Sequence, residues 1–184
     1  MPRTKLVEAI YRWRVRSGMI ALFAVLVLAE PTPIRIAGGI AASALGLLVR
    51  AWASGHIRKE KKLAVTGPYR FSRNPLYLGN FILGLGIAWG TRSWWCLGIF
   101  LGYFLFFYPA VILEEHERMR CLFPADYAAY HKRVPTFFPT FNPFPPTDGS
   151  RWSFALYKKN GEYRALLGTV TVWAIFVAKW WAWR

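Results

Sequence analysis

The chain alternates long apolar runs with shorter basic connections. Five runs contain no Asp, Glu, Lys or Arg, and these are residues 17–29, 36–49, 74–91, 93–113 and 165–178. A helix needs roughly 20 mostly apolar residues to cross a bilayer, with a range of about 17–25, so the third and fourth runs are long enough by themselves. The other runs need flanking residues, whose Arg and Lys side chains can snorkel to the interface. The pattern predicts an all-α integral membrane protein with about five transmembrane helices.

The predicted spans belong to a single membrane domain, residues 1–184. They lie near residues 13–30, 34–53, 75–91, 93–113 and 164–182. The third and fourth spans should form a tight hairpin, and Pro109 should kink the fourth. The basic start and the first apolar run also fit a signal peptide. No small-x-small cleavage site follows, so a retained helix is favoured.

Composition and charge refine this picture. The chain is 55% hydrophobic, above the roughly 45–50% of soluble domains, and its net charge is +15. Most of the Lys and Arg residues lie before the first run, in residues 56–73 and in residues 118–164. The positive-inside rule then places the N-terminus, the 56–73 loop and the 114–164 segment in the cytoplasm, and the C-terminus on the opposite side. In a bacterium the membrane would be the plasma membrane. Topology and contact with anionic lipids explain the charge, so no nucleic-acid partner is expected.

The polar segment before the third span reads VTGPYRFSRNPLYLGNF, residues 65–81. Gly67-Pro68 marks a turn. Pro75 suits the first turn of the third span, where its missing N–H costs nothing, and Asn74 then lies at or next to the N-cap. The free backbone N–H groups of that helix start can bind an anion.

Glu114 and Glu115 directly follow the fourth apolar run. One interpretation is surface charge, because Arg118 lies three and four residues further along the same helix. The alternative is a functional pair, because ionisable groups at membrane depth mark functional sites by default. Gly84 and Gly86 also allow two interpretations: close helix packing, or a ligand that approaches the backbone.

After the Glu pair, a short helix DYAAYHKR is predicted, with Asp126 as its N-cap. Tyr127, Tyr130 and His131 are spaced to share one face of it, which either packs on the membrane surface or contacts a substrate. Arg133 ends the helix with a fixed cation. The proline-dense residues that follow predict an ordered loop or a strip along the surface. The three histidines and two cysteines form no HExxH or two-Cys pattern, so no metal site is predicted.

Taken in order, these motifs resemble a known family. TGPYRFSRNPLYLG, then GLG, then EE, then FPADYAAYHKRVPTFFP is similar to the integral-membrane methyltransferases of the isoprenylcysteine carboxyl methyltransferase and phospholipid methyltransferase group. The resemblance covers residues 60–140. It implies S-adenosylmethionine bound at the cytoplasmic helix ends and methyl transfer to a membrane lipid or lipidated small-molecule acceptor.

The resemblance and the chemistry of the cofactor together assign roles to individual residues. The cofactor-binding residues would be Leu63, Ala64, Tyr69, Arg73, Asn74, Pro75, Leu76, Tyr77, Gly84, Gly86, Glu114 and Glu115. The substrate-binding residues would be Tyr127, Tyr130, His131 and Arg133. Glu115 and Arg133 would orient the reactants, with no covalent nucleophile, and Arg133 would hold an anion such as a carboxylate or a lipid phosphate.

Two departures from the family pattern leave the acceptor open. The family His before Pro is Asn74 here, which cannot carry a proton. The Arg that carboxyl methyltransferases carry one turn before the acidic pair is replaced by Val111 or its apolar neighbours. The alternatives are a phosphatidylethanolamine-type N-methyltransferase, an NADPH-dependent sterol-type membrane reductase and a non-catalytic lipid-binding protein. Glu114-Glu115 favours the methyl donor over NADPH.

Overall fold

The computed structural model describes residues 5–58, 62–145 and 149–183, with backbone alone for residues 5–11. Every regular element in this part of the chain is a helix, which confirms the all-α prediction. The α-helices and one 3₁₀ helix are α1 (Lys5–Leu28), α2 (Pro33–Ser54), η1 (Gly67–Arg70), α3 (Pro75–Gly90), α4 (Trp94–Leu122), α5 (Pro124–Arg133), α6 (Phe154–Lys159) and α7 (Tyr163–Ala182).

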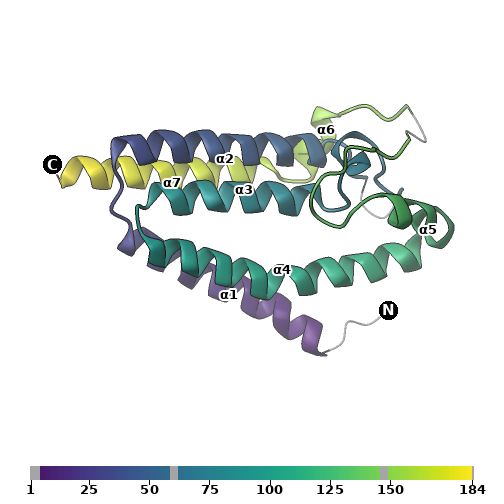
Figure 1. Cartoon of the computed structure of the whole chain (residues 1–184), viewed down its shortest axis with the longest axis horizontal. Coiled ribbons are helices and arrows are strands. Elements are labelled where there is room, and N and C mark those ends of the chain that lie inside the picture. The colour runs from purple at the N-terminus through teal and green to yellow at the C-terminus, as the bar shows by residue number, and fades with distance from the viewer. Residues whose placement is uncertain (1–4, 59–61, 146–148, 184) are drawn as a thin grey trace.

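The long helices lie side by side along the long axis of the molecule (Figure 1). The short helices η1, α5 and α6 and the loops around them gather at one end, which we call the loop end. α7 finishes at the opposite end. The segments that the charge pattern assigns to one side of the membrane therefore lie together.

Three of the five predicted spans are supported by the length and composition of their helices. Among the described residues, α2, α4 and α7 are long and apolar enough to cross a membrane. α3 has 16 residues, which at 1.5 Å per residue gives about 24 Å, short of the roughly 30 Å hydrocarbon core. α1 carries Arg12, Arg14 and Arg16 in its first half. The structure does not confirm the predicted count of five spans, nor that residues 74–91 suffice by themselves.

Glycines bring α2 and α3 close together. A Cβ on Gly46 would lie 2.6 Å from the carbonyl oxygen of Gly79, and a Cβ on Gly39 would lie 2.7 Å from that of Gly86. Both distances are too short for a real contact. Small residues at both crossings therefore set the separation of the two helices, as in many membrane helix pairs.

α4 turns back from α3 and then bends. Residues 91–93 alone separate the two helices, as the hairpin prediction requires. Pro109 lies inside α4, and Figure 1 shows the helix changing direction about halfway along its length. A proline removes one backbone hydrogen bond and crowds the preceding turn, so the bend has the predicted cause. It carries the last turns of α4 across the loop end.

Residues 134–145 form a strip fastened to the turn before α3. The N–H of Phe144 donates to the carbonyl of Arg70 at 2.9 Å, and Nε of Arg70 donates back to the Phe144 carbonyl at 2.7 Å. Ser72 Oγ donates to the Phe137 carbonyl at 2.7 Å. The strip is thus the ordered, surface-hugging segment that its proline content predicts.

The N-cap of α5 lies three residues earlier than predicted. Its first residue is Pro124 and its N-cap is Phe123, so Asp126 lies in the first turn. The prediction of Asp126 as N-cap was wrong, because the fixed φ of Pro124 already suits the first helical position. α5 is held through a small core at the loop end. That core consists of Leu63, Val65, Tyr127, Tyr130 and Val134.

Candidate active site

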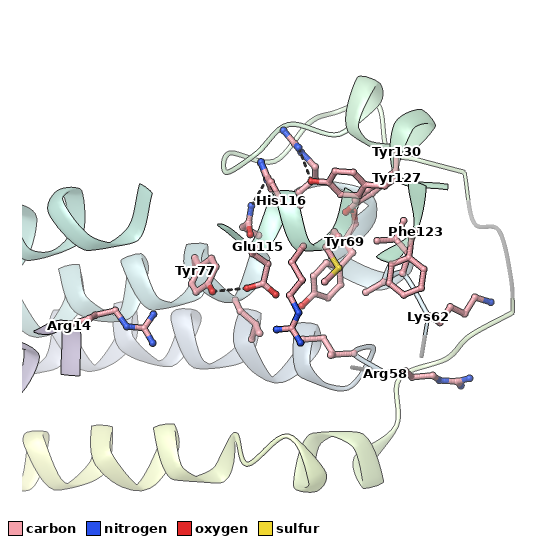
Figure 2. A pocket seen from close by; sticks show the side chains of 18 residues that line it. Arg14, Arg58, Lys62, Tyr69, Tyr77, Glu115, His116, Phe123, Tyr127 and Tyr130 are labelled. Atoms are coloured by element: carbon pink, nitrogen blue, oxygen red, sulfur yellow. Dashed lines mark hydrogen bonds between the residues drawn. The ribbon is translucent and has the colours of Figure 1, made fainter. Parts of the chain in front are cut away.

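A cavity of about 420 Å³ opens at the loop end between the turn before α3, the last turns of α4 and α5 (Figure 2). We call it the site pocket. Its volume lies within the roughly 300–1,000 Å³ of small-ligand pockets. Most of the predicted site residues line it. These are Leu63, Ala64, Tyr69, Arg73, Asn74, Leu76, Tyr77, Glu115, Tyr127 and Tyr130.

The start of α3 forms one wall. Asn74 is the N-cap and Pro75 the first helical residue, as predicted, but the Asn74 side chain makes no capping hydrogen bond. Its Nδ2 instead donates to the carbonyl of Thr136 at 2.8 Å, and it lies 3.4 Å from Nε2 of His116. Asn74 therefore ties the helix start to the strip rather than to its own backbone.

Tyr77 and Glu115 meet across the pocket. The Tyr77 hydroxyl donates to Oε2 of Glu115 at 3.0 Å. The Tyr77 ring packs edge-on against Tyr108, with 5.4 Å between centroids. Both partners line the pocket, so the bond fixes the Glu115 carboxylate at its wall. A carboxylate accepts up to about four hydrogen bonds, which leaves capacity for a ligand.

Arg73 brings a guanidinium into the same wall. Nη1 donates to the Tyr127 hydroxyl at 3.2 Å, and Nη2 donates to Thr136 Oγ1 at 2.5 Å. The Nε is buried and has no hydrogen-bond partner within the described part of the chain. A buried donor without a partner is costly, and the guanidinium adds a positive charge to the lining of the pocket.

Three tyrosines also line the pocket. Tyr130 donates from its hydroxyl to the carbonyl of Tyr69 at 2.7 Å. Burial raises the pKa of Tyr69, Tyr127 and Tyr130 above the ordinary value for tyrosine. Their hydroxyls therefore stay protonated at physiological pH, and the three side chains contribute neutral rings to the lining.

The helix glycines Gly84 and Gly86 are not among the lining residues described for the site pocket. A Cβ on Gly86 would lie 2.7 Å from Ser43 Oγ of α2, so Gly86 serves helix packing. Gly84 lines a different, apolar cavity. Pro75 is fully buried at the start of α3 and is not among the lining residues described for the site pocket.

Three further predicted residues lie outside the described lining of the site pocket: Glu114, His131 and Arg133. His131 is exposed beside Tyr127, with 5.8 Å between ring centroids. Arg133 is exposed, and its Nη2 donates to Asn142 Oδ1 at 2.9 Å. Of the two adjacent glutamates, Glu115 alone lines the pocket. The roles predicted for these three residues stay predictions.

Several lining residues were missed in the sequence. His116, Arg118 and Met119 come from the end of α4, and Phe123 is the residue between α4 and α5. Arg118 and Met119 lie three and four residues after Glu115, on the same helix face, and this spacing was a usable signal. The other missed residues are Arg14, Ile57, Arg58 and Lys62. Arg14 comes from α1, and no local motif marked it.

Two more cavities extend from the site pocket between α1, α3 and α4. The first, of about 430 Å³, shares Arg14, Leu76 and Tyr77 with the site pocket, and we call it the bridging cavity. The second, of about 160 Å³, shares Gly18, Tyr103 and Tyr108 with the bridging cavity and is otherwise lined by apolar side chains. We call it the apolar crevice. Polar surface near Glu115 thus leads stepwise to apolar surface between helices.

Among the described residues, no group of three or more His, Cys, Asp or Glu side chains could hold a metal ion.

Comparison with known proteins adds a family. A family model described as phospholipid methyltransferase matches residues 34–126, from α2 to the first turn of α5. No solved structure matches the chain.

Two curated relatives carry names from metal resistance. The chain is 34% identical over 110 residues to the cobalt-zinc-cadmium resistance protein CzcN of Cupriavidus metallidurans, which covers 59% of this chain and 50% of the relative. It is 37% identical to the nickel-cobalt-cadmium resistance protein NccN of Alcaligenes xylosoxydans xylosoxydans over 97 residues. These residues make up 52% of this chain and 45% of the relative. The chain thus spans about half the length of the curated relatives it matches.

Proposed function

Because the chain belongs to the phospholipid methyltransferase family, we propose that it transfers a methyl group from S-adenosylmethionine to a lipophilic acceptor in the membrane. One observation carries the proposal. The site pocket, which is lined by the Tyr77–Glu115 pair and by Arg73, adjoins cavities that lead between α1, α3 and α4.

The residues present fit the cofactor group by group. Glu115 accepts hydrogen bonds and suits the ammonium or the ribose hydroxyls. The Arg73 guanidinium lines the pocket and suits the carboxylate, and charge-assisted bonds of this kind are the stronger ones. The rings of Tyr69 and Tyr77 give the cationic sulfonium aromatic surface, to which cations are attracted.

The reaction asks for orientation more than for chemical catalysis. When bound, the cofactor supplies a methyl group on a positively charged sulfur, an electrophile that needs no covalent enzyme intermediate. The protein has to hold donor and acceptor in line and to exclude water. Tyr77 lines both the site pocket and the bridging cavity, and Glu115, its hydrogen-bond partner, lines the site pocket. We assign this orienting role to the pair.

The acceptor side favours an amphipathic molecule. Its polar end would lie in the bridging cavity, and its chain would lie in the apolar crevice. An isoprenylcysteine carboxylate and a phosphatidylethanolamine-type amine both have this form. The amine also requires a base, because it must lose a proton. His116 lines the site pocket and is our candidate for this base, because the histidine of the family pattern is replaced by Asn74.

One observation favours a second candidate. The lining of the site pocket contains five cationic residues, Arg14, Arg58, Lys62, Arg73 and Arg118, and one carboxylate, Glu115. Such an excess also suits a polyanionic cofactor such as NADPH, as in a sterol-type membrane reductase. We favour the methyl donor because the Glu115 carboxylate suits an ammonium group, which S-adenosylmethionine has and NADPH lacks. The names of the relatives come from metal resistance, but with no metal-binding group among the described residues we propose the acceptor, not a metal ion, as what the site binds.

Calorimetry on the purified protein tests the proposal. S-adenosylmethionine should bind and NADPH should not, and Glu115→Gln should weaken the binding. Binding of NADPH alone would replace the proposal with the reductase. Binding of neither would leave a lipid-binding protein without a cofactor.

A further inference from the structure

Among the described residues, two arginines line the bridging cavity, Arg50 and Arg14. Arg50 of α2 donates from Nε and Nη2 to Oε2 of Glu162 at 3.0 and 2.7 Å, and from Nη1 to Asn80 Oδ1. The side chains of Arg50 and Glu162 are 14% and 10% exposed. The charge of Arg50 is therefore matched by a carboxylate, and its fork joins α2, α3 and the start of α7.

Arg14 of α1 occupies the boundary between the two polar cavities. It lines both the site pocket and the bridging cavity. Figure 2 shows its side chain reaching from α1 toward Tyr77. The backbone behind it is fixed, because the Tyr103 hydroxyl of α4 donates to the Arg14 carbonyl at 3.0 Å. The guanidinium is thus carried to the place where an acceptor headgroup would meet the Tyr77–Glu115 pair.

The apolar crevice continues from this point, and two of its lining residues are glycines against which aromatic side chains of α4 pack closely. A Cβ on Gly18 would lie 2.9 Å from the Tyr103 hydroxyl oxygen, and a Cβ on Gly84 would lie 2.1 Å from the Phe100 ring. Larger residues at either position would displace these two rings, which also line the crevice. One path therefore offers a cation at its polar end and an apolar slot beyond it.

We propose that Arg14 binds an anionic group of the acceptor, a phosphate or a carboxylate, and so places the acceptor beside Tyr77 and Glu115 with its chain in the apolar crevice. The planar guanidinium pairs with either group through two parallel hydrogen bonds. This inference rests on the proposed function for the meaning of "acceptor". It goes beyond that function by naming the residue and the charge that select the acceptor.

Direct lipid binding tests the proposal without any reaction. The probes are dihexanoylphosphatidic acid for phosphate, S-farnesylcysteine derivatives with a free carboxylate, and dihexanoylglycerol as a neutral lipid. Calorimetry compares the wild type with Arg14→Gln, Arg14→Lys and the matched control Arg16→Gln, which removes the same charge two residues away from an exposed position.

Arg14→Gln should weaken binding of an anionic probe by about tenfold or more. Arg14→Lys should lie between it and the wild type, and Arg16→Gln should match the wild type. The probe that responds identifies phosphate or carboxylate. The proposal would be overturned if Arg14→Gln bound both anionic probes as tightly as the wild type does. It would also be overturned if Arg14→Gln weakened binding of the neutral lipid as much as binding of the anionic probes. If the proposed function alone is wrong, S-adenosylmethionine fails to bind while the Arg14 effect on lipid remains.

Discussion

The Tyr77 hydroxyl donates to the Glu115 carboxylate at 3.0 Å and joins α3 to α4 at the wall of the site pocket. The two residues are 38 positions apart and come from the two motifs that stand out most in the sequence. Their contact turns two separate patterns into one site, and the first predictions concern it.

Glu115→Gln should weaken S-adenosylmethionine binding by about tenfold or more. The reason is the loss of a charge-assisted hydrogen bond, worth roughly 1.5–3 kcal/mol. Calorimetry gives the dissociation constant. Glu117→Gln is the control, because Glu117 is on the same helix, exposed and paired with Arg120 at 3.1 Å. Unchanged affinity in Glu115→Gln would remove Glu115 from the cofactor site.

Tyr77→Phe keeps the ring and removes the hydroxyl that orients Glu115. We expect a smaller loss of cofactor affinity than in Glu115→Gln, because the carboxylate remains. The double variant should bind no more weakly than Glu115→Gln alone, since the two side chains act through one contact. Additive losses would mean that Tyr77 and Glu115 contribute independently.

The topology prediction follows from the distribution of Lys and Arg. A reporter fused after residue 184 should behave as external, and one inserted near Gly149 should behave as cytoplasmic. Reporter activity in intact cells measures both. If the two reporters fall on the same side, α7, the long helix between residue 149 and residue 184, does not cross the membrane.

Tyr130→Phe should lower the free energy of unfolding by about 0.5–1.5 kcal/mol, because the hydrogen bond to the Tyr69 carbonyl is lost.

The raised pKa of Tyr130 makes the stability of the folded state depend on pH. The folded state holds the neutral form, so this stability is present below the ordinary tyrosine pKa of about 10 and is lost as pH rises above it. Melting temperatures in detergent should fall above about pH 10, and less steeply in Tyr130→Phe. The exposed Tyr163 supplies the control, Tyr163→Phe, and an equal change there would point to general alkaline unfolding.

Gly86→Ala should destabilise the protein by about 1–3 kcal/mol, because the new methyl group would force α2 and α3 apart. Gly98→Ala is the control, since a Cβ there meets nothing within 4 Å. Melting temperature and cofactor affinity are measured together. A loss of affinity without a loss of stability would restore the cofactor role that the sequence predicts for Gly86.

The sequence predicts the site best where the constraint is local. Pro75 fixes the start of α3, and Glu115 directly follows an apolar run, so both positions can be read from neighbouring residues. The predicted strip is likewise a consequence of its own prolines. These features need no knowledge of how the helices pack.

The sequence predicts less well where the packing of distant helices decides. α3 is apolar on almost all of its faces, so the sequence does not show which face packs against α2. The different positions of Gly84 and Gly86 could therefore not be predicted. Arg133 is turned outward because Tyr127 and Tyr130 dock α5 through the other side. Arg14 reaches the site only because α1 lies along α4.

Thr136 binds two side chains of the motif before α3 although it is not part of that motif. It receives the side chain of Asn74 on its carbonyl and that of Arg73 on its hydroxyl, yet it lies beyond residue 126, where the family match ends. The matched segment therefore depends on residues outside it. A chimera that exchanges residues 34–126 with those of a relative keeps the motif, but Asn74 and Arg73 then face a strip from the other protein. The strip and the motif therefore have to be exchanged together.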